Sequence, residues 1–327
     1  HRTEEVPAMT LKLICAAHTP LMDHVETDPT IDARVRAQFA ALADEVAAYD
    51  PELIIIFGPD HFKGFFYEML PAFTIGVRAT AIGDYDIGSG EYDVPEALAL
   101  DCIRSVHKAG VDVGMSYRMR ADHGFSQLLV LLSGKVDRYP VLPVHINCAG
   151  PPLPPFGRVR VLGTAVGQWA SQQNKRILIL GSGGLSHDPP IPQLLNATPV
   201  VAEKLIAAQH QSVEERRARE EQNYEAARAL ARGEGESRPL SPAWDRDFMD
   251  RMARGDLGYL DDMSDDALTE LAGCGGHEVR NWLAAYSALA ASGPYRAENL
   301  LYYDIAHWNA GMGIATAEPK VEAITTG

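Results

Sequence analysis

The stretch Leu53–His61, LIIIFGPDH, runs from five consecutive apolar residues into a turn and then into an aspartate and a histidine. An apolar run that is rich in β-branched residues is typical of a strand buried on both faces. Gly58 and Pro59 end the strand, because proline lacks a ladder donor and glycine tolerates turn geometry. Ligands bind at the carboxyl ends of strands in an open α/β sheet, so His61 is placed for metal binding or proton transfer. A turn histidine with an ordinary hydrogen bond is the alternative interpretation.

Three further predicted strands also precede a histidine. They are Leu11–Ala17 before His18, the weaker Val111–Ser116 before Asp122-His123-Gly124, and Lys175–Leu180 before Gly181–His187. A random scatter of 11 histidines would not favour this arrangement. The glycine-rich turn 181–187 lacks the spacing of a phosphate loop or a nucleophile elbow. We therefore expect its glycines to let the backbone approach a ligand and to direct His187 inward.

The order of strands and helices predicts an α/β fold, with a mostly parallel or mixed central sheet flanked by helices and a helical C-terminal part. Asp28 and Pro29 begin an amphipathic helix that extends to residue 49, which makes the first two strands a parallel β-α-β unit. Residues 139–147 form another predicted strand, whose prolines favour an edge or a strand end. His145 lies inside that strand and is interpreted as structural. Residues 199–232 are predicted to be a solvated helix, and we interpret their charges as a surface face.

The composition limits the classes of function. The chain has 327 residues, of which 46% are apolar, and we expect residues 9–327 to form a single catalytic domain after a non-native remnant, His1–Ala8. The 29 basic and 44 acidic residues give a net charge of −15, which argues against nucleic acid or anionic membranes as partners. Four widely spaced cysteines without a Cys-x-x-Cys pair indicate a reducing cytoplasm. No apolar run reaches the length of a membrane span.

Two kinds of metal chemistry fit histidines combined with a carboxylate. Two histidines and one carboxylate on one face of an octahedral ion are the usual ligands of non-heme Fe(II) enzymes that activate oxygen. The same ligands can hold zinc for hydrolysis, and spacing alone does not choose between the metals. Glu278, in the first turn of a predicted helix, is either such a ligand or a helix-capping carboxylate. The loop Thr80–Asp93 is long enough to be functional.

Five motifs, in order along the chain, resemble those of the class III extradiol ring-cleaving dioxygenases of the LigB type. They are HTPL (18–21), GPDH (58–61) followed by GFFY (64–67), DHGF (122–125), GSGGLSH (181–187) and HEV (277–279). The resemblance extends from Met9 to about Trp308 and is greatest to the branch that acts on 2,3-dihydroxyphenylpropionate. The chain departs from that pattern at Phe62-Lys63, where a more polar pair of the Tyr-Asn type is typical.

The resemblance implies that His18, His61 and Glu278 bind Fe(II), that His187 is the catalytic base and that His123 is an acid. It implies an extradiol dioxygenase that inserts both atoms of O₂ into a catechol, such as 3-(2,3-dihydroxyphenyl)propionate, during aromatic catabolism. The product is then a 2-hydroxymuconate-type semialdehyde or ketone acid. We also expect a cytoplasmic homo-oligomer.

Some assignments stay open at this point. Asp60 either orients a ligand imidazole or forms the turn, and the aromatic side chains near it either contact the substrate or pack as core. These aromatic residues are Phe62, Phe65, Phe66 and Tyr67. The basic residues available to bind a substrate carboxylate are Lys63, Arg78, Arg118 and Arg120. Alternative functions are cleavage of another catechol or an aminophenol, zinc-dependent hydrolysis, and a metal-free interaction protein. The last should lack one of the five site residues, and all five are present.

Overall fold

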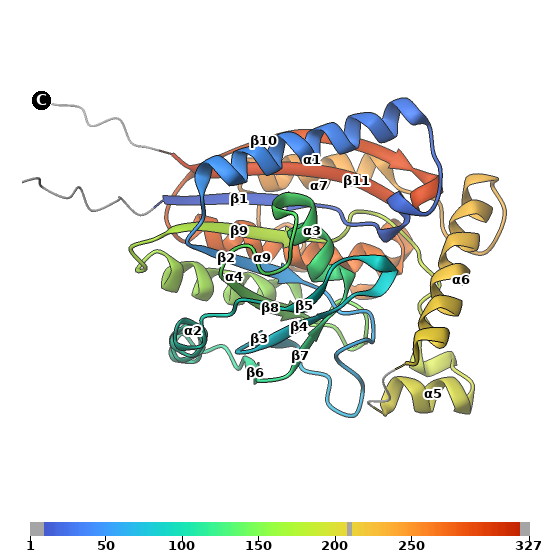
Figure 1. The fold of residues 1–327 in the computed structure, drawn as a ribbon, viewed down its shortest axis with the longest axis horizontal. Coiled ribbons are helices and arrows are strands. Elements are labelled where there is room, and N and C mark those ends of the chain that lie inside the picture. Colours follow the sequence, from blue (N-terminus) through green and yellow to red (C-terminus); the bar gives the residue numbers. More distant parts are fainter. Residues whose placement is uncertain (1–9, 208–210, 321–327) are drawn as a thin grey trace, which may run out of the picture.

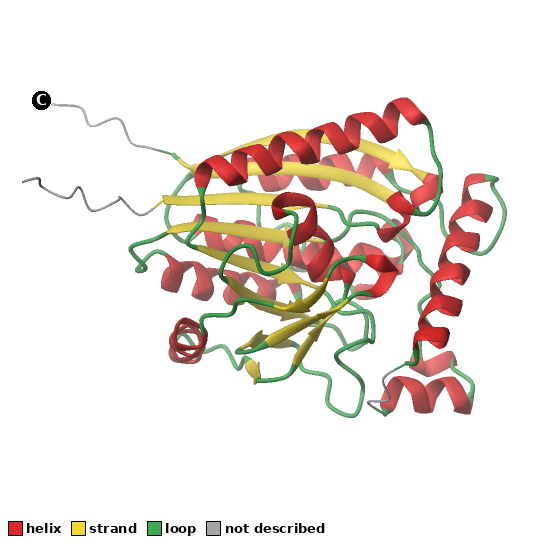
Figure 2. Cartoon of the chain, in the orientation of Figure 1, coloured by secondary structure: helices red, strands yellow, loops and turns green. Residues whose placement is uncertain are grey.

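The structure is a computed structural model that describes residues 10–207 and 211–320, so the predicted remnant His1–Ala8 lies outside the described residues. Within these ranges, a mixed sheet of eight strands has helices on both faces (Figures 1 and 2). Its strand order is β10-β11-β1-β9-β2-β8-β3-β6. The strands are β1 (Thr10–Ala16), β2 (Leu53–Gly58), β3 (Phe73–Gly76), β6 (Gly114–Ser116), β8 (Val141–Ile146), β9 (Arg176–Ser182), β10 (Tyr295–Ile305) and β11 (Ala310–Pro319). The predicted fold class is confirmed.

The four central strands, β1, β9, β2 and β8, run parallel to one another. Along β2, alternate side chains enter two different cores: Ile55 and Phe57 pack with α4 and α9, while Ile54 and Ile56 pack with α1 and α3. Burial on both faces explains why the strand is apolar throughout. The helices of these two layers are α1 (Pro29–Tyr49), α3 (His123–Ser133), α4 (Phe156–Ala170) and α9 (Val279–Ala290).

Helix α1 spans the range predicted from sequence. Asp28 Oδ1 accepts hydrogen bonds from the backbone N–H groups of Thr30 and Ile31, which satisfies donors that the first turn leaves free. The buried side chains, spaced three or four residues apart, face the sheet. The helix ends where Asp50 adopts a left-handed conformation with φ 49°.

Strand β8 lies between β2 and β3, so the edge position considered for its prolines is wrong, whereas Pro140 does stand at the start of the strand. Pro143 pairs with Ile56 of β2, but the ladder between β8 and β3 begins only at Val144. Pro143 has no backbone N–H to donate, and it lies where β3 does not pair with β8. Gly76 makes room for the proline ring, because a Cβ there would lie 2.8 Å from Pro143 Cγ.

The region around residues 80–121 differs from the prediction. Of the expected strand Val111–Ser116 only β6 is extended, and it lies at the edge of the sheet. A second sheet, in the order β5-β4-β7, takes up much of the expected loop Thr80–Asp93. Its strands are β4 (Ala79–Ile82), β5 (Ser89–Glu91) and β7 (Met119–Ala121). His123 therefore follows β7 of this small sheet, whereas the other three histidines follow strands of the large one.

The C-terminal part contains a β-hairpin that the sequence did not reveal, β10–β11, and β11 pairs antiparallel with β1. The other helices are α2 (Glu96–Lys108), α5 (Pro199–Ile206), α6 (Val213–Ala231), α7 (Pro242–Arg254) and α8 (Asp265–Ala272). Figure 1 shows α6 on the right, beyond the ends of the central strands. Among the described helices, none combines the length and hydrophobicity required to cross a bilayer.

Candidate active site and metal centre

Three neighbouring parallel strands bring three histidines together. His18, His187 and His61 follow β1, β9 and β2, which are adjacent in the sheet. Parallel strands end at the same edge of a sheet, so residues far apart in the sequence meet there. Glu278 reaches the same point from a short 3₁₀ helix, Cys274–Glu278, that precedes α9, and it is 2% exposed.

The carboxylate of Glu278 lies among the imidazoles. Its Oε1 is 3.0 Å from His61 Nε2 and 3.3 Å from His187 Nε2, and its Oε2 is 3.6 Å from His18 Nε2. Although Glu278 stands at the N-terminus of α9, its side chain makes no capping hydrogen bond. The structure therefore supports the ligand interpretation of Glu278 over the helix-capping one.

Glycines allow this close packing. Gly183 has φ 114°, and a Cβ at this position would lie 2.4 Å from Glu278 Oε2. The next residue, Gly184, donates its N–H to the same oxygen at 2.9 Å. Trp282 Nε1 donates to the Gly183 carbonyl at 2.8 Å and fixes the turn. The glycine-rich turn therefore brings its backbone against the Glu278 carboxylate, and its approach to a ligand stays a prediction.

Polar partners behind the rings orient two of the histidines. Asp122 Oδ2 accepts hydrogen bonds from the backbone N–H and the Nδ1 of His61, both at 2.9 Å. His18 Nδ1 lies 3.1 Å from Ser182 Oγ. Because each Nδ1 is engaged, both rings present Nε2 toward Glu278. Metal-binding histidines are commonly held in this way.

Asp60 has a different place from the orienting role considered for it. Its carboxylate accepts hydrogen bonds from the backbone N–H groups of Lys63, Gly64 and Phe65, so it forms the turn after β2. Burial and the neighbouring Asp122 raise the pKa of Asp60 to about 7. The carboxylate that holds His61 is that of Asp122.

The other two histidines have distinct partners. His123 Nδ1 lies 2.7 Å from Oδ2 of Asp84, a residue that is 2% exposed. His187 Nδ1 lies 3.0 Å from the carbonyl oxygen of Leu185. At Nδ1, one ring therefore faces a carboxylate and the other a neutral carbonyl. Burial disfavours the charged form of His187, but Glu278 beside its Nε2 outweighs burial and raises the pKa of His187.

A buried network fixes the segment that carries His187. Asp245 accepts hydrogen bonds from the backbone N–H of Ser186 at 2.8 Å, from its hydroxyl at 2.7 Å and from the Tyr302 hydroxyl at 2.6 Å. Asp245 is fully buried, so these bonds replace the water that its carboxylate loses. The residue before His187 is thereby tied to α7 and β10.

The site places a neutral imidazole next to charged side chains. Burial lowers the pKa of His18 to about 3, against the attraction of Glu278. Burial also disfavours the charged form of His61, but Asp122 and Glu278 outweigh it and raise the pKa of His61 well above its usual value. Burial opposes ionisation of Glu278 and Asp122, yet the adjacent histidines hold the pKa of both carboxyls below the usual range. Both carboxylates are therefore ionised at neutral pH.

A cavity of about 460 Å³ adjoins these residues, a size suited to a small organic ligand. The four histidines line it together with Phe62, Phe66, the segment 189–192 and residues of α5 and α6. The interpretation of residues 199–232 as a surface face is therefore wrong for one side of α6, which forms a wall of the cavity. A helix with charges on all sides carries the same sequence signal whether one face meets solvent or a cavity.

The donor set fits a divalent metal ion. Ring nitrogens of His18, His61 and His123 lie within 4.8 Å of one another, so His123 competes with Glu278 as a third ligand. His61 and His123 are stacked, with centroids 4.4 Å and planes 14° apart, whereas His18 and His61 are perpendicular. An imidazole lone pair lies in the ring plane, so stacked rings direct theirs along nearly parallel lines. Convergence on one ion thus favours His18, His61 and Glu278.

Comparison with known proteins gives the family. The model of the catalytic LigB subunit of aromatic ring-opening dioxygenase matches residues 12–313. The chain belongs to the LigB family. It is 46% identical to a 2,3-dihydroxyphenylpropionate/2,3-dihydroxicinnamic acid 1,2-dioxygenase from Photorhabdus laumondii, over 96% of this chain and 99% of the relative. Enzymes of the same name from Cupriavidus pinatubonensis and Azotobacter vinelandii are 46% and 42% identical, over 95% of this chain and 99% and 100% of theirs.

The solved structure of an uncharacterized protein, JW3007, from Escherichia coli K12 shares the LigB-type fold of this chain. The two are 13% identical, with a TM-score of 0.54 over 93% of this chain and 98% of the other. This similarity concerns the fold alone.

The aromatic residues considered as substrate contacts of this LigB-family chain separate into two groups. Phe62 and Phe66 line the cavity. Phe65 instead stacks on His145, with ring centroids 4.1 Å apart, and the Tyr67 hydroxyl donates to the Pro151 carbonyl. Phe62 therefore stays a predicted substrate contact, whereas Tyr67 stacks on Phe62 without lining the cavity and Phe65 packs on His145. His145 is 1% exposed and lies against Phe65, as its structural interpretation predicts.

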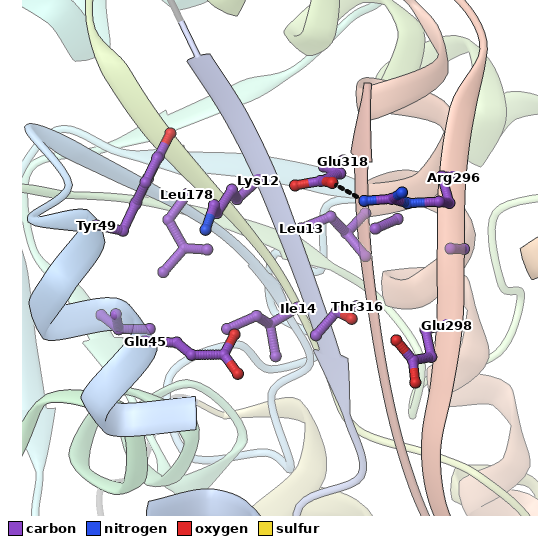
Figure 3. A pocket seen from close by; sticks show the side chains of 13 residues that line it. Lys12, Leu13, Ile14, Glu45, Tyr49, Leu178, Arg296, Glu298, Thr316 and Glu318 are labelled. Atoms are coloured by element: carbon purple, nitrogen blue, oxygen red, sulfur yellow. Dashed lines mark hydrogen bonds and ion pairs between the residues drawn. The ribbon is translucent and has the colours of Figure 1, made fainter. Parts of the chain in front are cut away.

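A second cavity, of about 360 Å³, lies away from the histidines of this LigB-family chain. It is bounded by α1, β1 and the β10–β11 hairpin, and Figure 3 shows its floor of apolar side chains with charged residues around it. Arg296 pairs there with Glu318. The described residues that line it include no histidine or cysteine, so it offers no comparable metal donors.

Asp84, Asp122 and Ser182 are site residues whose roles the sequence did not give. Asp122 directly precedes His123, and Asp84 lies in the loop Thr80–Asp93, whose length indicates a functional loop. Their partners are 61 and 39 residues away in the chain, so pairing required the fold.

Asp122→Asn is expected to weaken metal binding about 10- to 100-fold, the usual effect of removing a carboxylate behind a ligand histidine. Asparagine retains an oxygen that can accept from Gly124 N–H, so the start of α3 should keep its cap. The check is metal titration of the variant beside Asp112→Asn, a change at an exposed carboxylate. Equal affinity in both variants would show that Asp122 does not support a metal ligand.

Proposed function

We propose that this LigB-family protein is an Fe(II)-dependent extradiol dioxygenase that opens the ring of a catechol with a carboxylate side chain, such as 3-(2,3-dihydroxyphenyl)propionate. The observation that carries the proposal is the convergence of His18, His61 and Glu278 beside two further histidines in one cavity. The names of the relatives, which act on 2,3-dihydroxyphenylpropionate, support the substrate class.

His18, His61 and Glu278 would hold the metal. When bound, Fe(II) supplies open coordination positions for the catechol oxygens and the electron density that activates O₂. His18 and His61, after β1 and β2, line the cavity, and Glu278 reaches them from the start of α9. A catechol can enter through the cavity.

His187 is assigned as the base that removes a proton from the catechol. The carbonyl of Leu185 accepts from Nδ1, so the proton of the neutral ring resides on Nδ1 and Nε2 carries the lone pair. Nε2 lies 3.3 Å from Glu278 Oε1 and would be available to the catechol once that carboxylate holds the metal. A positioned base of this kind contributes about 10²- to 10⁴-fold to a proton transfer. The tautomer that this hydrogen bond favours supports the base role.

His123 is assigned as the acid. The buried carboxylate of Asp84 accepts from Nδ1 at 2.7 Å and can stabilise positive charge on the ring while its other nitrogen holds a proton. The ring can then donate that proton as the carbon–carbon bond beside the diol breaks. Both atoms of O₂ enter the product, which is a 2-hydroxymuconate-type semialdehyde or ketone acid.

We extend the proposal to a cytoplasmic homo-oligomer. The four cysteines are unpaired, and three of them are buried, which suits a reducing compartment. The oligomeric state stays a prediction from sequence.

Oxygen consumption by anaerobically Fe(II)-loaded protein, measured with a panel of substituted catechols, tests the proposal. We expect rapid uptake with 3-(2,3-dihydroxyphenyl)propionate and the appearance of a coloured ring-opened product. A mild oxidant should inactivate the enzyme, and ascorbate with Fe(II) should restore it. Protein loaded with Zn(II) should be inactive; turnover with zinc and without oxygen uptake would establish the hydrolase alternative instead.

A further inference from the structure

Among the described residues that line the cavity beside the histidines, three carry cationic side chains, Lys63, Lys204 and Arg219. Lys204 has a counter-charge, because its Nζ lies 3.0 Å from Glu215 Oε1. Within residues 10–207 and 211–320, Lys63 and Arg219 form no ion pair with a carboxylate. Two positive charges that line a partly apolar cavity without a salt-bridge partner indicate an anionic group on the ligand.

Arg219 lies on the face of α6 that forms the cavity wall and is partly buried. Its Nη2 donates to the Pro190 carbonyl at 2.5 Å, which uses one of five guanidinium donors. Glu215, one helical turn earlier, is placed to pair with it but instead binds Lys204 and the backbone N–H of Ser212. Burial lowers the pKa of Arg219, as expected for a cation that lacks a nearby carboxylate.

Lys63 approaches the same space from the loop after β2, two residues beyond His61. Its Nζ donates to Gln211 Oε1 at 2.6 Å, and Lys63 lines the same cavity as Arg219. The carboxylates of Asp84 and Asp122 partly balance the Lys63 charge from a distance. Arg219 is therefore the cation with the greater need of a partner.

We propose that Arg219, assisted by Lys63, binds the carboxylate of the substrate side chain, so that α6 determines which catechols are cleaved. This assignment rests on the proposed function. The planar guanidinium can hold a carboxylate through two parallel hydrogen bonds, a geometry that lysine does not offer. Phe62, Phe66 and Leu205 provide apolar surface in the same cavity for the ring and the methylene groups.

The binding site should discriminate strongly against uncharged side chains. A cavity that presents donors to a carboxylate leaves them unpaired when a neutral analogue enters, and this costs more than a missing apolar contact. Among the basic residues considered from sequence, Arg78 is exposed and pairs with Glu96, and Arg118 is exposed as well. Neither these two nor Arg120 lines the cavity.

The test compares Arg219→Gln and Lys63→Met with the parent protein, using 3-(2,3-dihydroxyphenyl)propionate and the neutral 3-propylcatechol. We expect KM and the calorimetric Kd for the acid to rise about 10- to 100-fold in Arg219→Gln, the range for a charge-assisted hydrogen bond. The kcat for the acid should change little, and values for 3-propylcatechol should stay within about twofold. For the acid, the KM and Kd of Arg219→Lys should lie between those of the parent protein and those of Arg219→Gln.

Arg217→Gln is the matched control, because Arg217 lies on the same helix and is exposed. Equal losses with both catechols in Arg219→Gln would assign Arg219 to anchoring α6 on Pro190 and would overturn the binding role. Unchanged preference for the acid would overturn it too. Anaerobic calorimetry separates the binding role of Arg219 from the proposed dioxygenase activity, because it measures substrate binding without turnover. Selective binding of the acid that depends on Arg219, without oxygen uptake, would uphold this site and refute the dioxygenase. Oxygen uptake by Arg219→Gln with the parent's preference for the acid would refute this site and uphold the dioxygenase.

Discussion

Glu278→Gln, His18→Ala and His61→Ala proteins are each expected to lose most of their iron and nearly all ring cleavage. The loss of metal affinity should be greater than the factor of about 10 to 100 expected for Asp122→Asn. These changes remove a ligand itself, whereas Asp122→Asn removes the carboxylate that holds a ligand. Glu278→Gln is the most informative of the three. It keeps the shape of the side chain but removes the negative charge that faces His61 at 3.0 Å and His18 at 3.6 Å.

Iron content per chain and oxygen uptake check this prediction. Glu270→Gln serves as the control, because Glu270 is exposed and pairs with Arg238 on the protein surface. Circular dichroism should show that each variant is folded. Full iron content together with normal activity in any one variant would remove that residue from the ligand set.

His187→Gln and His123→Gln are expected to keep their iron and to lose about 10²- to 10⁴-fold in ring cleavage. The two should differ before oxygen is added. Without the base His187, the catechol should be deprotonated poorly, so the anaerobic absorbance of the deprotonated substrate should weaken. Without the acid His123, that absorbance should develop normally and the reaction should stall after oxygen is admitted.

The pH dependence of the parent enzyme provides a further check on these roles. An acid and a base that act in one cycle give a bell-shaped rate profile, whose apparent pKa values belong to the coupled site. Equal anaerobic absorbance in the two variants would show that the roles are wrongly assigned. Turnover at the native rate in either variant would make that histidine a structural one.

Sequence reasoning was most successful where the signal was local. The five apolar residues of β2 define a strand buried on both faces, and the turn after it places His61 at the sheet edge. Asp28 and Pro29 similarly define the start of α1. In each case neighbouring residues alone determine the conformation, so the pattern was sufficient.

It was least successful where the partner is distant in the chain. Asp122, and not Asp60, holds His61, and nothing within one turn distinguishes these two aspartates. The central position of β8 depends on where β3 stops pairing, and the role of α6 depends on which face meets the cavity. Glu278 and His61 are 217 residues apart, so their contact is a property of the fold.

Anomalous diffraction from anaerobically Fe(II)-loaded crystals would locate the iron site that we assign to His18, His61 and Glu278. We expect a single iron peak bonded to Nε2 of His18, to Nε2 of His61 and to the Glu278 carboxylate, with His123 and His187 beside it but not bonded. A peak at the neighbouring group of Asp84, Asp122 and His123, or one in which His123 replaces Glu278 as the third ligand, would contradict it.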